Sequence, residues 1–217
     1  MANFAVVLSG CGFFDGAEIH ESVLTLLALD TNNHIYQCFA PDIGQMHVVN
    51  HLSGETAEGE TRNVLVESAR IARGNIKPLT ELSVNDFDAI IFPGGFGAAK
   101  NLCSFAVKGA DMTVEPSVEA VAKSFAEASK PAGYVCIAPA MLTKIYGSGV
   151  QCTIGNAEDV AGAITAMGGE HIQCEVTEIV VDEARKVVTT PAYMLANRIS
   201  EAATGINKLV EQINKWL

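Results

Sequence analysis

The sequence predicts an α/β fold built on a mainly parallel sheet. Short apolar runs alternate with longer segments whose apolar residues recur at helical spacing. Apolar residues make up 49% of the 217-residue chain, which is enough for a large core. No repeat, low-complexity tract or linker interrupts the pattern, so we expect a single domain over residues 1–217.

Strand and helix signals alternate through the first half of the chain. Phe4–Leu8 and Asp88–Phe92 are continuous apolar runs, as expected for strands covered on both faces, and His34–Phe39 is a further strand candidate. Ala17–Leu29 and Thr61–Arg73 carry apolar residues at helical spacing. This order predicts βαβ units, whose strands are parallel.

The second half continues the alternation. Its predicted elements are a helix at Ser117–Ser129, a strand at Ala132–Val135, helices at Ala138–Tyr146 and Asn156–Met167, a small β-hairpin at Glu178–Thr189 and a mostly helical segment at Tyr193–Leu217. Two long irregular segments remain, Pro41–Glu60 and Asn101–Pro116, and loops of this size are often functional.

Charge and hydrophobicity argue against several kinds of partner. The formal net charge of −11 at pH 7 repels phosphate backbones, so we do not expect a nucleic-acid partner. No apolar stretch is long enough to span a bilayer, and Met1–Gly10 resembles a buried strand more than a signal peptide. We therefore expect no membrane partner either.

The six cysteines are scattered, with no CxxC motif and no histidine at zinc-ligand spacing. Reduced thiols in a reducing compartment, the cytoplasm, are therefore expected. His47 and His51 have the i, i+4 spacing of metal ligands on a helix, but Met46–Asn50 looks more like a strand. We expect neither a metal nor a cofactor.

Unusual residues follow three of the predicted strands. The first strand runs into Ser9–Glu18, the strand at Asp88–Phe92 into Pro93–Gly97, and the strand at Ala132–Val135 into Cys136. Ligands of open parallel sheets bind beyond the carboxyl ends of the strands, so these loops should meet at one rim.

Cys136 stands where a strand turns directly into a predicted helix. Such a sharp turn exposes one side chain at the helix N-terminus, as in a nucleophile elbow, and the backbone N–H groups there favour a thiolate. Pro139 fits the first turn, where its missing N–H costs nothing. The alternative is a buried structural cysteine, because a free cysteine packs as a small hydrophobic residue.

Three groups near Cys136 could serve it. The bare backbone of Gly94 and Gly95, with the N–H of Ile137, could form an oxyanion hole, or Gly94–Gly95 could be an ordinary turn. Glu18 could share a proton with the thiol, or it could merely interact with the dipole of its helix. Five residues are candidates for lining a substrate site: Cys11, His20, Gly94, Phe96 and Asn101.

These residues lie in segments that resemble a known family. The segments are Leu8–Gly12, Asp15–Glu21, Glu60–Leu65, Phe92–Leu102, Cys136–Pro139 and Val188–Ala192. The sequence resembles the ThiJ/PfpI-like group of the class I glutamine amidotransferase-like superfamily, and within it the ElbB subgroup, described as a glyoxalase and as linked to isoprenoid biosynthesis. The resemblance implies a flavodoxin-like three-layer sandwich and a homodimer.

The resemblance also implies roles for single residues. Cys136 would match the elbow cysteine, Glu18 the acid that faces it, and Gly95 and Ile137 the oxyanion donors. Many relatives carry a histidine after the cysteine, but here Ile137 follows it. Amidotransferases carry a His-x-Glu pair where this chain has Thr189–Tyr193. We therefore do not expect glutamine hydrolysis, which needs a base to deprotonate the thiol and protonate ammonia.

Three hypotheses of function remain open at this point. The first, implied by the resemblance, is a slow, glutathione-independent glyoxalase that converts glyoxal or methylglyoxal and water to a hydroxy acid, with Cys136 as nucleophile and Glu18 as proton shuttle. The second is a redox or carbonyl-stress sensor that uses the same thiol. The third is a non-catalytic regulator, linked to isoprenoid biosynthesis, that binds a metabolite.

Overall fold

The computed structural model describes residues 1–217 and is built around one seven-stranded sheet, with the strand order β10-β11-β7-β6-β1-β2-β5. Its strands are β1 Asn3–Val7, β2 Ile35–Ala40, β5 Ile76–Pro78, β6 Ala89–Phe92, β7 Ala132–Val135, β10 Val180–Asp182 and β11 Val187–Thr190. All neighbours pair in parallel except β10 and β11. The predicted mainly parallel sheet is confirmed.

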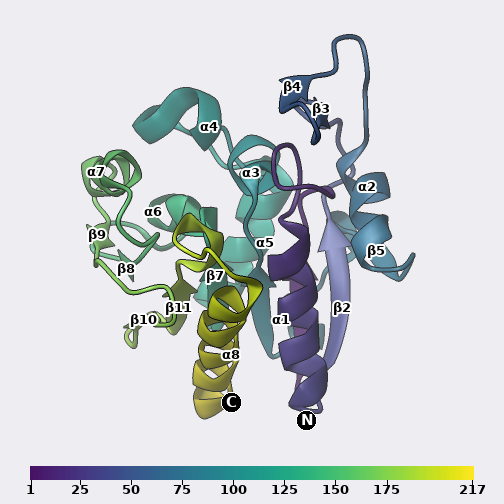
Figure 1. Cartoon of the computed structure of the whole chain (residues 1–217). Coiled ribbons are helices and arrows are strands. Elements are labelled where there is room, and N and C mark those ends of the chain that lie inside the picture. Colours follow the sequence, from purple (N-terminus) through teal and green to yellow (C-terminus); the bar gives the residue numbers. More distant parts are fainter.

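Helices cover both faces of this sheet, which confirms the three-layer sandwich (Figure 1). One face packs against α1 Ile19–Thr31 and α8 Ile199–Trp216, and the other against α5 Pro116–Glu127 and α6 Leu142–Tyr146. The side chains of β1 alternate between the two cores, and none of its residues from Phe4 to Val7 is exposed. Burial on both faces is why β1 is a continuous apolar run.

The predicted hairpin at Glu178–Thr189 is present, but as part of the main sheet. Its two strands, β10 and β11, pair in antiparallel fashion, and β11 also pairs with β7. The small separate antiparallel sheet lies instead in the long segment Pro41–Glu60, where β3 Val49–Asn50 pairs with β4 Glu55–Thr56. Two further short strands, β8 Gln151–Cys152 and β9 Glu170–His171, form a parallel pair.

The remaining helices lie at or beside the carboxyl ends of the strands, together with the β3–β4 hairpin (Figure 1). They are α2 Val64–Ile71, α3 Phe96–Lys100, α4 Phe105–Lys108 and α7 Glu158–Ala166, with single 3-10 turns at Leu79–Glu81, Val84–Asp86, Gly109–Asp111, Ala138–Met141 and Ala192–Met194. No helix of the chain combines the length and the apolar character needed to cross a membrane.

Two predicted helix starts are wrong. The segment Ala138–Tyr146 is a 3-10 turn followed by the five-residue helix α6, so no long helix begins beside Cys136. Asn156 does not cap α7; the N-cap is Ala157, whose side chain makes no capping hydrogen bond. Packing against neighbouring elements, which the sequence pattern does not contain, sets both boundaries.

Candidate active site

The loops after β1, β6 and β7 meet at one rim, as predicted, because these strands are neighbours in the sheet. Backbone hydrogen bonds join the first loop to the second. The N–H of Glu18 donates to the Gly94 carbonyl at 2.9 Å, and the N–H of Gly97 donates to the Gly16 carbonyl at 2.8 Å. The third loop is joined to the end of β11, because the N–H of Cys136 donates to the Thr190 carbonyl at 2.9 Å.

Cys136 occupies a strained turn directly after β7. Its φ of 61° lies in the left-handed region, which costs a residue with a side chain about 1–2 kcal/mol. The residue is 7% exposed, and what is exposed lines a cavity. Strain and access together match the predicted elbow rather than a cysteine sealed in the core.

The carboxyl that contacts this thiol belongs to Glu21. Its Oε2 accepts the N–H of Gly94 at 3.0 Å and its Oε1 accepts the N–H of Tyr193 at 3.1 Å, and it lies beside the thiol of Cys136, whose pKa it raises. Glu21 is fully buried, on the first turn of α1. A buried acid held by groups from three loops can take or return the thiol proton without moving.

Glu18, the acid predicted from the sequence, lies one turn earlier and does something else. It is the N-cap of α1, where its Oε2 accepts the N–H of Glu21 at 2.7 Å. Its side chain is half-buried and lines the same cavity as Cys136. The two acids are three residues apart, a spacing that brings the side chains of an N-cap and of the first helical turn close together and would have flagged Glu21 from the sequence.

Burial dominates the protonation of the thiol and carboxyl pair. It raises the pKa of Glu21 to about 8, against hydrogen bonds from Tyr193 and Gly94 that favour the charged carboxylate. Burial and the nearby Glu21 also raise the pKa of the Cys136 thiol well above its usual range. Both shifts favour the protonated forms, in the direction opposite to the thiolate that the turn was predicted to favour.

Two backbone N–H groups face the sulfur and partly oppose the rise in the pKa of the thiol that burial causes. They belong to Gly95 and Ile137, the donors predicted for an oxyanion hole, and both lower the pKa of Cys136. Gly95 has a φ of 94°, and a Cβ there would stand 2.3 Å from the N of Glu18. A Cβ on Gly94 would stand 2.4 Å from the Cβ of Cys136 and 2.7 Å from Oε2 of Glu21. Both glycines are therefore needed for the thiol, the acid and the donors to meet.

The thiol opens into a cavity of about 380 Å³. Its walls come from the loop before α1, from α3, α4 and α7, and from the 3-10 turns beside Cys136 and at Ala192–Met194. The lining residues are mostly apolar: Phe13, Glu18, Gly95, Phe96, Ala99, Phe105, Ala106, Cys136, Ile137, Asp159, Val160, Tyr193 and Met194. Of the predicted lining residues, Phe96 is in this wall.

The other predicted lining residues lie outside the cavity. Gly94 sits behind the thiol and binds Glu21. His20 is exposed, and its Nδ1 is 2.8 Å from the hydroxyl of Tyr193, at the cavity edge. Cys11 is half-buried near Glu67, and burial raises its pKa.

Asn101 joins the loop after β1 to the long segment before α2. Its Nδ2 donates to the carbonyls of Ser9 and Asp15, both at 2.9 Å, and its Oδ1 accepts the N–H of Met46 at 3.0 Å. It is 5% exposed. Because all its polar atoms are engaged with backbone, Asn101 fixes the shape of the rim rather than contacting a ligand.

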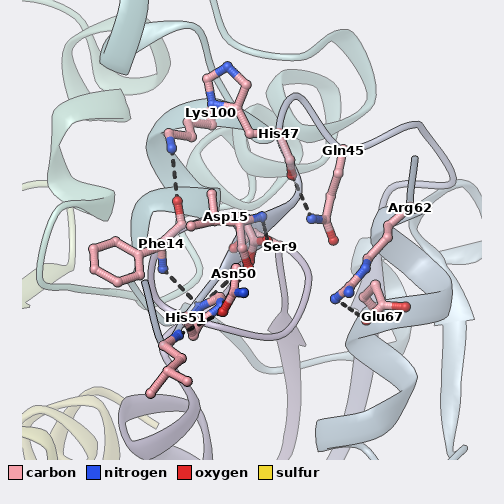
Figure 2. Close-up of polar contacts among 12 residues, drawn as sticks. Ser9, Phe14, Asp15, Gln45, His47, Asn50, His51, Arg62, Glu67 and Lys100 are labelled. Atoms are coloured by element: carbon pink, nitrogen blue, oxygen red, sulfur yellow. Dashed lines mark hydrogen bonds and ion pairs between the residues drawn. The ribbon is translucent and has the colours of Figure 1, made fainter. Parts of the chain in front are cut away.

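The β3–β4 hairpin is docked onto the same loop through polar contacts (Figure 2). Oδ2 of the buried Asp15 accepts the N–H of Val49 at 2.7 Å. Nε2 of His51 accepts the N–H of Phe14 at 3.3 Å, and Nζ of Lys100 donates to the carbonyl of Phe14 at 2.8 Å (Figure 2). These contacts hold the segment whose Phe13 forms one wall of the cavity.

Comparison with known proteins identifies close relatives. The human protein "Glutamine amidotransferase-like class 1 domain-containing protein 3, mitochondrial" is 48% identical over 98% of this chain and 82% of its own length. The crystal structure of an "isoprenoid biosynthesis protein with amidotransferase-like domain" from Ehrlichia chaffeensis has a TM-score of 0.92 and 37% identity, and covers 99% of this chain and 100% of its own. No protein-family model matches the chain.

A more distant structure shares only the fold. Glyoxalase III from Candida albicans has a TM-score of 0.64 and 12% identity, and covers 99% of this chain and 96% of its own.

Proposed function

Because this chain belongs to the glutamine amidotransferase-like class 1 family, within the ThiJ/PfpI/DJ-1 superfamily, we propose that it converts an α-oxoaldehyde and water to a 2-hydroxy acid. Glyoxal and methylglyoxal are the simplest such substrates. One observation carries the proposal: the Cys136 thiol opens into a cavity, lies beside the buried carboxyl of Glu21 and is faced by the N–H groups of Gly95 and Ile137. The fold shared with a glyoxalase III supports it.

In the first step the sulfur of Cys136 adds to the aldehyde carbon. The thiol proton passes to Glu21 if that carboxylate is charged, or leaves to solvent, and the C–S bond forms as the C=O π electrons move onto oxygen. The N–H groups of Gly95 and Ile137 are beside the sulfur and can donate to this oxyanion. The oxyanion then takes a proton back from Glu21 or from solvent, and the product is a hemithioacetal.

In the second step a proton moves between the two substrate carbons, and we assign this step to Glu18. One of its carboxyl oxygens is held by the N–H of Glu21, which leaves the other free beside the cavity. It removes the proton from the former aldehyde carbon and delivers it to the neighbouring carbon, while the hydroxyl proton passes from the first oxygen to the second, giving the thioester of the 2-hydroxy acid. Water then cleaves the C–S bond, releases the acid and returns the thiol.

Turnover of glyoxal and methylglyoxal, followed by NMR detection of glycolate and lactate, tests the proposal. Wild type should turn over slowly, since the site lacks a third base and such a loss costs about 10²- to 10⁴-fold. Cys136→Ser should abolish the activity, whereas Glu18→Gln, which can still cap α1, should retain the hemithioacetal step and lose product. Equal turnover by wild type and Cys136→Ser would refute the proposal.

A second function is favoured by the high pKa of Glu21. A protonated Glu21 can donate to an oxygen bound to the sulfur of Cys136, so the site would stabilise a sulfenic or sulfinic acid formed by peroxide. Intact-mass analysis after mild peroxide treatment should then find Cys136 modified before the other five cysteines. Modification of all six cysteines to the same extent would exclude a sensor. A metabolite that binds Cys136→Ala unchanged would instead support a non-catalytic regulator.

The proposal extends to the partner, the oligomeric state and the location of the protein. We propose a small carbonyl metabolite as its partner, and a homodimer, which light scattering would detect. We also keep the cytoplasm as the predicted location, although the human relative is named as mitochondrial. Imaging of the tagged protein with markers for both compartments distinguishes the two.

A further inference from the structure

Building on the proposed function, we propose that the preferred substrates are α-oxoaldehydes with an apolar substituent of several carbons, rather than glyoxal or methylglyoxal. The cavity beside Cys136 is the source of this inference. It measures about 380 Å³, within the range of about 300–1,000 Å³ that is typical of pockets for drug-sized ligands. Glyoxal would fill only a small part of it.

The chemistry of the walls selects for apolar groups. Three phenylalanines, Phe13, Phe96 and Phe105, line the cavity, and aliphatic or thioether side chains complete the wall. Apart from Tyr193, the polar side chains in the wall are Cys136 and two acids, Glu18 and Asp159. A reactive polar end beside the thiol and an apolar remainder describe the ligand that fits such a cavity.

The charges of the lining residues exclude other large carbonyl compounds. None of the lining residues is a lysine or arginine. Lys100 lies over the ring of Phe96, with its Nζ 5.1 Å from the ring centroid, but it is not a lining residue and its Nζ donates to the carbonyl of Phe14. Phosphate or carboxylate groups on a substrate would meet the carboxyl groups of Glu18 and Asp159 in the cavity instead. Sugar phosphates and keto acids are thereby disfavoured, which leaves neutral, apolar substituents.

Two of the wall residues expose unusual apolar area. Phe96 is 48% exposed and Phe13 is 42% exposed, although both rings belong to the cavity wall. An apolar substituent lying against these rings would remove their surface from water, and the free energy gained favours the longer substrate. Phe13 is held by the backbone, since its carbonyl accepts the N–H of Phe96 at 2.8 Å.

Comparison of glyoxal, methylglyoxal and hexylglyoxal tests the proposal. Burial of one methylene group contributes up to about a fourfold gain in affinity, so kcat/KM for hexylglyoxal should exceed that for methylglyoxal by about tenfold or more. The same Cys136→Ser variant measures the background for each aldehyde. Equal or lower kcat/KM for hexylglyoxal would overturn the inference while leaving the proposed function intact.

Two tryptophan variants on one helix locate the effect. Ala106 lines the cavity, whereas its neighbour Val107 does not and is 67% exposed. Ala106→Trp should fill part of the cavity and lower the ratio of kcat/KM for hexylglyoxal over methylglyoxal. Val107→Trp should leave that ratio at the wild-type value. An unchanged ratio in both variants would place the substituent elsewhere and overturn the inference.

A binding measurement keeps the inference testable if no aldehyde is turned over. Protection of Cys136 from iodoacetamide is measured with two neutral hydroxyketones, 1-hydroxy-2-octanone and hydroxyacetone, which carry the substituents of hexylglyoxal and methylglyoxal without a carboxylate. Stronger protection by 1-hydroxy-2-octanone would support an apolar ligand even if the proposed reaction failed. Equal protection by both would overturn the inference.

Discussion

The buried carboxyl of Glu21 should make the stability of the protein depend on pH, and Glu21→Gln should remove that dependence. The pKa of Glu21 rises from 4.5 to about 8 on folding, chiefly through burial. The folded chain therefore binds this proton more tightly than the unfolded chain. The corresponding stability is fully present below pH 4.5 and is lost as the pH rises through about 8.

The size of the effect follows from the two pKa values. Each pH unit between 4.5 and about 8 corresponds to about 1.4 kcal/mol, which gives a change of about 5 kcal/mol across the whole interval. Glutamine has nearly the same shape and no charge to bury. Its amide NH₂ must face the N–H of either Gly94 or Tyr193, which adds a cost that does not vary with pH.

The assay is urea unfolding of wild type and Glu21→Gln at several pH values. The variant should be the less stable protein in acid, and the wild type should lose this advantage as the pH approaches 8. A difference between the two proteins that stays constant across this range would show that Glu21 is not a buried titrating acid in the folded protein.

Alkylation of Cys136 gives a second readout of the same pair. A charged Glu21 raises the pKa of the thiol, so Glu21→Gln should shift the pH profile of iodoacetamide reaction toward lower pH. Glu18→Gln is the matched control, because Glu18 is not among the groups that shift the pKa of the thiol and acts on the pair only by raising the pKa of Glu21, so its effect on the profile should be the smaller one. A shift in Glu18→Gln alone would show that Glu18, and not Glu21, is the acid that acts on the thiol.

Three further outcomes follow from backbone geometry and buried polar contacts. Gly94→Ala forces a Cβ to within 2.4 Å of the Cβ of Cys136, so urea unfolding should show a loss of about 1–3 kcal/mol together with lost activity. Gly162→Ala, on α7 where an added Cβ meets nothing, should instead add about 0.5–1 kcal/mol. Asp15→Ala leaves the N–H of Val49 without its acceptor, which should cost about 1–3 kcal/mol and speed proteolysis within the β3–β4 hairpin; unchanged cleavage would contradict this role.

Local sequence patterns predict much of the fold. Runs such as Phe4–Leu8 and Ala89–Phe92 are apolar because both of their faces are covered, so the central strands could be predicted directly. The shortest strands could not. β5, β8 and β9 have two or three residues each, and hydrogen bonds to distant partners rather than their own composition make them strands.

The sequence by itself determined that three strand ends carry unusual residues, and the order of the strands then required those residues to meet. That topology places Cys136, Gly95 and Ile137 at one rim, whereas their roles as nucleophile and donors are what the family resemblance implies. Which of two acids on one helix contacts the thiol was decided only by the tertiary structure, which buries Glu21 against Gly94 and Tyr193 and leaves Glu18 at the cavity. The physical reason is that proton affinity depends on distances and on the exclusion of water, and both arise when separate loops pack together.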